Sequence, residues 1–186
     1  MNFIDSSAHA IAKCIRRNYS EAGSEIALRY AISLLINTLT AICVAVIITF
    51  FTGHVAECIV GIISFIVIRY VSGGMHMSSS LSCCILSIII FITISNFTFH
   101  YSVAFFIIDS LSLIIFIITA PNNIKNVSSI NEKYYPLLKL ISVIFVGCNF
   151  IINSTVLSAA FIIQAFLTTT ISYKLRDVIE RRIPNL

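Results

Sequence analysis

The stretch Arg69-Tyr-Val-Ser-Gly-Gly-Met-His-Met-Ser-Ser-Ser-Leu-Ser-Cys-Cys84 is a polar segment between two strongly apolar ones. It contains a pair of glycines and a run of serines, and His76 stands seven residues before Cys83. The apolar runs on both sides approach the roughly 20 residues that a membrane-spanning helix needs. The sequence therefore predicts a membrane protein organised around this polar segment.

The composition of the whole chain supports a membrane location. Of its 186 residues, 58% are hydrophobic and only 11% are charged. Soluble domains usually have about a quarter charged residues, so this chain has too little polar surface to cover a soluble globule. The net charge of +4 is small and scattered, so we expect no nucleic-acid partner.

Apolar segments divide the chain into membrane-spanning candidates. We expect an all-α polytopic membrane protein with about six transmembrane helices, forming one membrane-embedded domain over residues 1–186. A tight connection is expected at residues 96–101. The six segments are 27–51, 55–70, 81–97, 99–120, 136–152 and 155–173.

The two ends and the longest loop are polar. Residues 1–25 lack the arrangement of a signal peptide, and Ile4, Ala8, Ile11 and Ile15 recur at helical spacing, so this leader is either an amphipathic helix on the membrane surface or a solvated segment. The loop 121–135 contains Asn122, Asn123, Lys125 and Asn126, and Pro136 suits the first turn of the helix that follows it. Residues 174–186 form a basic tail.

Lysine and arginine indicate the orientation. With six spans, all twelve lie on one face, which the positive-inside rule assigns to the cytoplasm together with both termini and the polar segment. They are Lys13, Arg16, Arg17, Arg29, Arg69, Lys125, Lys133, Lys139, Lys174, Arg176, Arg181 and Arg182.

The polar segment combines a thiol with an imidazole. A thiol attacks a carbonyl carbon as the thiolate, and a nearby histidine is the usual base that forms it. Ser78, Ser79 and Ser80 are candidate N-cap residues, so Cys83 should lie in about the first helical turn. There the helix dipole favours an anion and unpaired backbone N–H groups can bind one.

Geometry restricts where His76 can lie. Seven residues on one straight helix would separate it from Cys83 by about 10 Å, beyond the reach of proton transfer. A catalytic His76 must therefore lie off the helix, and Gly73-Gly74 provides the backbone freedom for the chain to fold back. From the residues alone, His76 could equally be a polar interfacial side chain and Cys83 a small apolar one, and nothing chooses Cys83 over Cys84.

The spacing Arg69-x4-Gly74-x-His76-x6-Cys83, between the second and third spans, resembles the AgrB family (accessory gene regulator protein B). Ala120-Pro121-Asn122 is similar to the beginning of the family's loop after span four. Only the Arg/Gly/His/Cys spacing is specific, although the resemblance extends loosely over most of the chain.

The resemblance implies a multi-pass cysteine endopeptidase of the bacterial cell membrane. It would cleave the C-terminal tail from a small AgrD-type precursor peptide and help to form a cyclic thiolactone or lactone quorum-sensing signal. Cys83 would be the nucleophile and His76 the base, with Arg69 and Gly74 supporting the site. The resemblance implies self-association as a homodimer and contact with membrane lipid, but no cofactor or metal. Arg69 could also be a plain charged anchor.

Other residues suggest different functions. Asp109 lies deep in a predicted span, where acids are costly and often functional, and favours helix packing or a proton or peptide path. A small transporter or channel component without covalent chemistry is therefore the alternative function. Asn122 could orient His76, whereas His9, His54 and His100 are expected far from Cys83. The H-E-x-x-H motif of zinc peptidases and a G-x-S-x-G motif are both absent from the sequence.

Overall fold

The computed structural model describes residues 3–19, 21–123 and 130–182. Apart from one isolated bridge, these residues form helices and loops, which confirms the all-α prediction. The elements are α1 (Phe3–Asn18), α2 (Glu25–Thr52), α3 (Val55–Ser72), α4 (Ser80–Ser95), α5 (Val103–Thr119), η2 (Glu132–Tyr134), α6 (Tyr135–Gly147), α7 (Asn149–Ile152), α8 (Thr155–Thr168) and α9 (Thr170–Arg182). Lys125 and Asn126, and the last four tail residues, lie outside the described part.

Three of the helical segments are long and apolar enough to cross a membrane. They are Glu25–Thr52, Val55–Ser72 and Glu132–Ile152, and α8 with α9 adds a fourth if that bent pair counts as one span. The helices α4 and α5 are apolar but shorter, with 16 and 17 residues. Large apolar side chains such as Phe51, Val103 and Ile151 are exposed on the outside, as lipid contact requires. The chain is a polytopic helical membrane protein, and the count of six spans stays a prediction.

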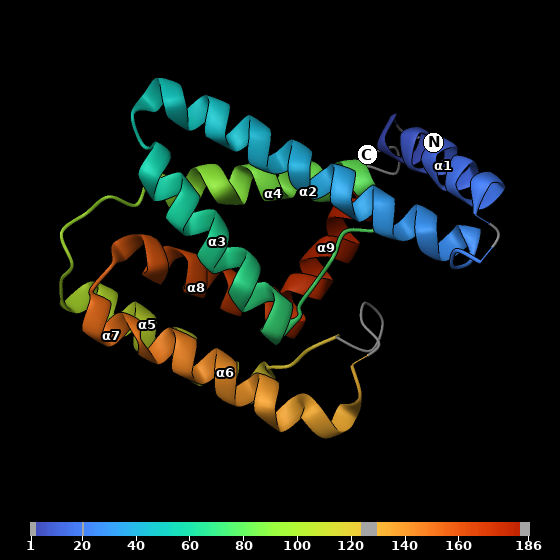
Figure 1. The fold of residues 1–186 in the computed structure, drawn as a ribbon. Helices are drawn as coiled ribbons and strands as arrows, with labels where there is room; N and C mark the ends of the chain where they lie inside the picture. The colour runs from blue at the N-terminus through green and yellow to red at the C-terminus, as the bar shows by residue number, and fades with distance from the viewer. Residues whose placement is uncertain (1–2, 20, 124–129, 183–186) are drawn as a thin grey trace.

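The helix α3 lies at the centre of the bundle, with α2 and α4 on one side and α6 and α8 on another (Figure 1). The apolar interior includes Phe65 and Ile68 of α3 and Phe161 of α8. Gly61 permits α3 to approach α4 closely, since a Cβ there would lie 2.5 Å from a methyl carbon of Ile94.

The leader is an ordered helix. Ile4, Ala8 and Ala12 of α1 are buried, and α1 packs along the first half of α2 (Figure 1). Ile4 and Ala8 of the predicted apolar spacing thus serve a helix contact, while Ile11 and Ile15 are exposed, and the alternative of a solvated segment is wrong. Pro136 lies in the first turn of α6, as predicted.

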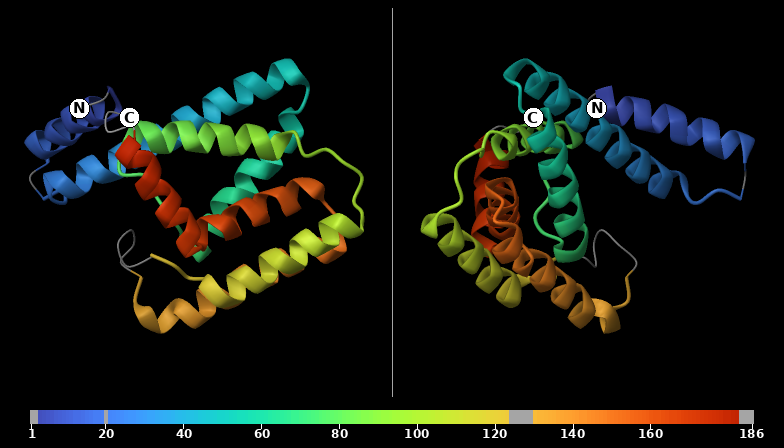
Figure 2. Two further views of the ribbon diagram at one scale, coloured as in Figure 1. Left: turned by 180° about the vertical axis from the view of Figure 1, so that it is seen from behind. Right: turned by 60° about the vertical axis from the view of Figure 1, so that its left-hand side comes forward.

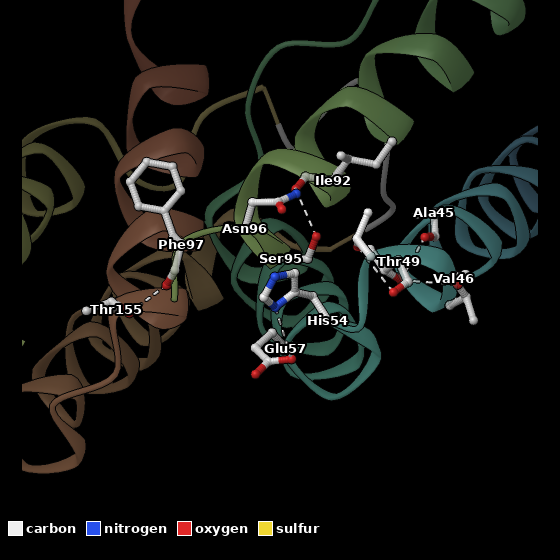
Figure 3. A network of polar contacts seen from close by, with 11 residues as sticks. Ala45, Val46, Thr49, His54, Glu57, Ile92, Ser95, Asn96, Phe97 and Thr155 are labelled. Carbon is white, nitrogen blue, oxygen red and sulfur yellow. Dashed lines mark hydrogen bonds and ion pairs between the residues drawn. The ribbon is translucent and has the colours of Figure 1, made fainter. Parts of the chain in front are cut away.

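The connection between α4 and α5 lies close to the predicted residues 96–101, but it is extended rather than tight. The helix α5 begins at Val103, so residues 96–102 are an extended connector, and the expectation that a helix begins at residue 99 was wrong. Thr155 accounts for this, because its hydroxyl donates to the carbonyl oxygens of Phe97 (2.6 Å) and Phe99 (3.3 Å). The carbonyl oxygens of Phe97 and Phe99 thus have a hydrogen-bond donor although the segment is not helical. Figure 3 shows the Thr155–Phe97 contact at this end of the bundle.

The predicted last span is broken. Instead of one helix over 155–173, α8 ends at Thr168 and α9 continues from Thr170 at a bend of 75°. The carbonyl oxygens of Leu167 and Thr168 accept hydrogen bonds from Met75 N–H (2.9 Å) and Asn122 Nδ2 (2.6 Å). Because loop groups occupy carbonyls that a continuing helix would use, the helix turns there, and α9 runs toward the beginning of α4 (Figure 2).

The helix ends that carry the described lysines and arginines lie toward the right-hand side of Figure 1. They are the beginnings of α2 and α6, the end of α3, and α9, with α1 beside them. The opposite connectors lie on the left. This arrangement agrees with the single charged face expected from the sequence, while its assignment to the cytoplasm stays a prediction.

Candidate active site

His76 lies in the loop 73–79 between α3 and α4, off the helix as the spacing required. The loop leaves α3 through Gly73 and Gly74, whose φ angles of 70° and 122° are in the region that side chains disfavour. Ser79 is the N-cap residue of α4, which places Cys83 in the first turn, as predicted. The Cys83 N–H already donates to the Ser79 carbonyl oxygen (3.0 Å), so any oxyanion donors are earlier N–H groups.

Backbone contacts with two distant segments fix this loop. Gly73 forms a parallel bridge with Asn122, and Gly74 N–H donates to the Asn122 carbonyl oxygen at 2.9 Å. A Cβ at Gly74 would lie 3.1 Å from the carbonyl oxygen of Leu167. Gly74 is therefore required by both its conformation and its surroundings. The Asn122 side chain donates to the Thr168 carbonyl oxygen, so it holds the loop against α8 instead of orienting His76.

Arg69 reaches from the last turn of α3 under the loop. Its Nη2 donates to the Met75 carbonyl oxygen (2.6 Å) and lies 3.3 Å from His76 Nδ1, while its Nη1 donates to Gln164 Oε1 (3.3 Å). Within the described part of the chain, no carboxylate forms an ion pair with Arg69. Its charge therefore has no carboxylate partner among the described residues, and it acts electrostatically on His76.

Gln164 is a site residue that the sequence reading missed. It is fully buried on α8, and its Nε2 donates to the Gly73 carbonyl oxygen (2.6 Å) and the Ser72 hydroxyl (2.9 Å). With its bond to Arg69, it joins the guanidinium to the beginning of the loop. A polar residue within the apolar run 155–173 was the signal available in the sequence.

The environment of His76 favours the neutral ring. Burial, and secondly the positive charge of Arg69, lower the pKa of His76 from 6.5 to about 4. Since arginine only donates hydrogen bonds, the contact with Arg69 makes Nδ1 the acceptor and leaves the ring proton on Nε2. Near neutral pH, His76 is therefore an uncharged imidazole beside a permanent cation.

The helix α9 covers the other side of the loop. Arg176 Nη1 donates to the His76 carbonyl oxygen at 3.3 Å, and Ser78 N–H donates to Glu180 Oε1 at 2.8 Å. From the sequence, the basic tail was expected to determine orientation in the membrane. In the structure it is a helix that holds the backbone on either side of Met77.

The structure separates the two adjacent cysteines. Cys84 is 3% exposed, and its Sγ points toward the Asn37 carbonyl oxygen of α2 at 3.7 Å. Cys83 is partly exposed and lines a cavity of about 590 Å³ together with His76. Only Cys83 thus combines an accessible thiol with a place on the wall that His76 shares.

The remaining candidates lie elsewhere, with one exception. Asp109 is fully buried on α5, where its Oδ2 accepts from Tyr101 Oη (2.8 Å) and Asn149 Nδ2 (2.9 Å). It joins helices and does not line the cavity. The exception is His9, which was expected far from Cys83 but lines the same cavity and pairs with Glu25 at 3.4 Å. The folding of α1 onto α2 brings it there.

The residues present suit covalent chemistry by a thiol. Among the described residues, no three His, Cys, Asp or Glu side chains gather as a metal site would require. The features of the site are an accessible thiol in the first turn of a helix, a neutral imidazole and a guanidinium that forms no ion pair with a described carboxylate.

The fold and this site define a class of helical membrane protein with a histidine and a cysteine around one polar cavity. A comparison with protein families matches residues 8–175 to the family described as Accessory gene regulator B. The chain belongs to the AgrB family, and its role lies in the processing of a quorum-sensing peptide. No curated protein and no solved structure matches the chain.

Proposed function

We propose that the protein is a cysteine endopeptidase that cleaves the C-terminal tail from an AgrD-type precursor peptide. The observation that carries this proposal is the shared cavity, on whose wall the accessible Cys83 and the neutral His76 both lie. Family membership supports the substrate class. Arg69 supports the chemistry, because its contact with His76 Nδ1 keeps the ring neutral.

In the first step, Arg69 releases His76 Nδ1, whose lone pair accepts the guanidinium N–H in the structure, and the Cys83 thiol gives its proton to that nitrogen. The sulfur attacks the scissile carbonyl carbon, the peptide C–N bond breaks, and the proton passes from His76 to the departing amine. A low pKa makes His76 a weak base but a strong acid for that second transfer.

The product of this step is a thioester between the precursor and Cys83. A thiol of the precursor then attacks that thioester, loses its proton through His76, and returns the sulfur of Cys83 as a thiol. One thioester replaces another, so the exchange is close to isoenergetic and closes a thiolactone ring, while a hydroxyl would close a lactone. Water must be excluded from the intermediate, and a half-enclosed cavity suits this requirement.

The test is coexpression with the precursor peptide encoded beside the gene, followed by mass measurement of the products. Cys83→Ala and His76→Ala should each abolish removal of the tail, whereas Cys84→Ala, the adjacent matched control, should retain it. Cleavage that survives Cys83→Ala refutes the mechanism. An Asp109→Asn variant that alone abolishes production of the extracellular signal would favour the transport alternative.

A further inference from the structure

The cavity extends well beyond His76 and Cys83. Its other walls come from α1 and from one face of α2, and its size falls in the range of about 300–1,000 Å³ typical of small-ligand sites. It can hold a few residues of an extended peptide but no folded domain. The lining residues outside the loop and α4 include Asp5, His9, Glu25, Arg29, Ser33 and Asn37.

Asn37 on this wall has an unusual environment. Asn37 is 5% exposed, and its Oδ1 is buried without a hydrogen-bond partner among the described residues. Buried polar groups almost always have partners, and one left unpaired costs free energy. Asn37 lines the cavity, and its Oδ1 gains a partner when the amide turns toward a ligand bound there that supplies the missing hydrogen bond.

The position of Asn37 relates this amide to the nucleophile. The backbone carbonyl of Asn37 contacts Cys84 Sγ at 3.7 Å, so this turn of α2 packs against the first turn of α4. The cavity reaches both Asn37 and Cys83. A ligand bound at Asn37 thus extends toward the thiol.

The shape of this wall is fixed by hydrogen bonds between three helices. Ser80 Oγ donates to Asp5 Oδ1 at 2.8 Å and lies 2.8 Å from Ser33 Oγ. These contacts hold α1 and α2 against the beginning of α4, which makes the cavity a preformed site.

An amide side chain offers one acceptor and two donors, and a peptide group offers the complementary N–H and C=O. The hydroxyl, amide and charged groups around Asn37 also favour a peptide over an acyl chain. We propose that this cavity binds the precursor as an extended chain, with the Asn37 amide hydrogen-bonded to a substrate peptide group near the scissile bond. This assignment rests on the proposed function and makes Asn37 a substrate-binding residue.

The test compares Asn37→Leu with Thr40→Leu in purified protein. Thr40 is exposed one turn further along α2 and does not line the cavity. The substrate is a synthetic copy of the precursor encoded beside the gene. Asn37→Leu should lower kcat/KM for its cleavage by at least about tenfold and leave the melting temperature equal or higher, because an unpaired buried amide is replaced by an apolar group. Thr40→Leu should cleave normally.

A second measurement does not depend on turnover. In a His76→Ala background, the rate at which iodoacetamide alkylates Cys83 is measured with and without the peptide, and peptide mapping separates Cys83 from the exposed cysteines. The peptide should slow alkylation of Cys83, and Asn37→Leu should remove this protection without changing the rate in the absence of peptide.

The outcomes separate the two proposals. Four results would each overturn the role of Asn37. Three concern Asn37→Leu: normal cleavage together with normal protection, a lower melting temperature, or a changed alkylation rate of Cys83 without peptide. The fourth is that the peptide gives no protection in the His76→Ala protein itself. Cleavage by Cys83→Ala would overturn the proposed mechanism, while loss of protection in Asn37→Leu would still identify the peptide site.

Discussion

Replacing Gln164 with leucine tests whether α8 positions the loop 73–79, which carries His76. Leucine has a similar size but removes the hydrogen bonds to Gly73, Ser72 and Arg69. Each neutral bond contributes about 1 kcal/mol and the one to the guanidinium about 2 kcal/mol, or about 4 kcal/mol together. The greater apolar burial of leucine returns about 1–2 kcal/mol. The expected net loss of unfolding free energy is therefore about 2–3 kcal/mol.

The stability of Gln164→Leu can be followed in detergent with a thiol-reactive dye that detects exposure of the buried Cys58 and Cys84. The variant should melt at a lower temperature, and below its melting point it should cleave the precursor about 10–100-fold more slowly, because Arg69 and the loop lose their common anchor. The control is Phe166→Leu, at an exposed position of the same helix. Melting and cleavage like the wild type in Gln164→Leu would refute the anchoring role.

Gln164→Glu separates the two parts of that role. Glutamate keeps an acceptor for Arg69 but cannot donate to Gly73 or Ser72 when ionised, and its charge compensates the guanidinium. We expect the acidic limb of its pH–rate profile at higher pH than in Gln164→Leu, because a compensated Arg69 lowers the pKa of His76 less. Equal limbs in the two variants would contradict an electrostatic role for Arg69.

The acidic limb of the pH–rate profile should lie near pH 4 rather than 6.5, because cleavage needs neutral His76 and burial and Arg69 lower its pKa to about 4. The unfolded chain binds this proton first as the pH falls, so the stability linked to His76 is complete above pH 6.5 and is lost between pH 6.5 and about 4. An acidic limb near pH 6.5 in the wild type, or a limb that does not move to higher pH in Arg69→Met, would contradict the buried position of His76 beside Arg69. Gly74→Ala should cost about 1–3 kcal/mol of local strain and slow cleavage at least about tenfold, whereas Gly147→Ala, in a helix with open space around it, should cleave normally. Asp109→Ala should lower the melting temperature through loss of the bonds to Tyr101 and Asn149 while Cys83 is alkylated at the wild-type rate; a slowed reaction would show that Asp109 acts on the site.

The helical membrane architecture was predictable because apolar run length determines it directly. The position of His76 off the helix was predictable as well, since a distance along a helix follows from residue spacing alone. Cys83 in the first turn followed from the serines before it. These predictions depend on local geometry, which a sequence determines without knowledge of distant contacts.

The parts that the sequence did not predict depend on contacts between distant residues. The bend at Thr169 arises because Met75 and Asn122 occupy carbonyls of α8, and periodicity within residues 155–173 gives no sign of it. The choice between Cys83 and Cys84 depends on which one packs against Asn37. His9 entered the cavity wall because α1 folds onto α2, which an amphipathic pattern alone could not distinguish from binding to a membrane surface.

The contacts between the loop and α8–α9 have a consequence for biosynthesis. The His76 carbonyl and its Arg176 partner are 100 residues apart, which a ribosome translating about 5–20 residues per second needs several seconds to cover. During that time Cys83 and His76 have been synthesised, but α8 and α9, which hold the loop, have not. The loop of the nascent chain is thus expected to lack its final arrangement until the C-terminal helix is made, so the proposed activity would begin only with the complete bundle.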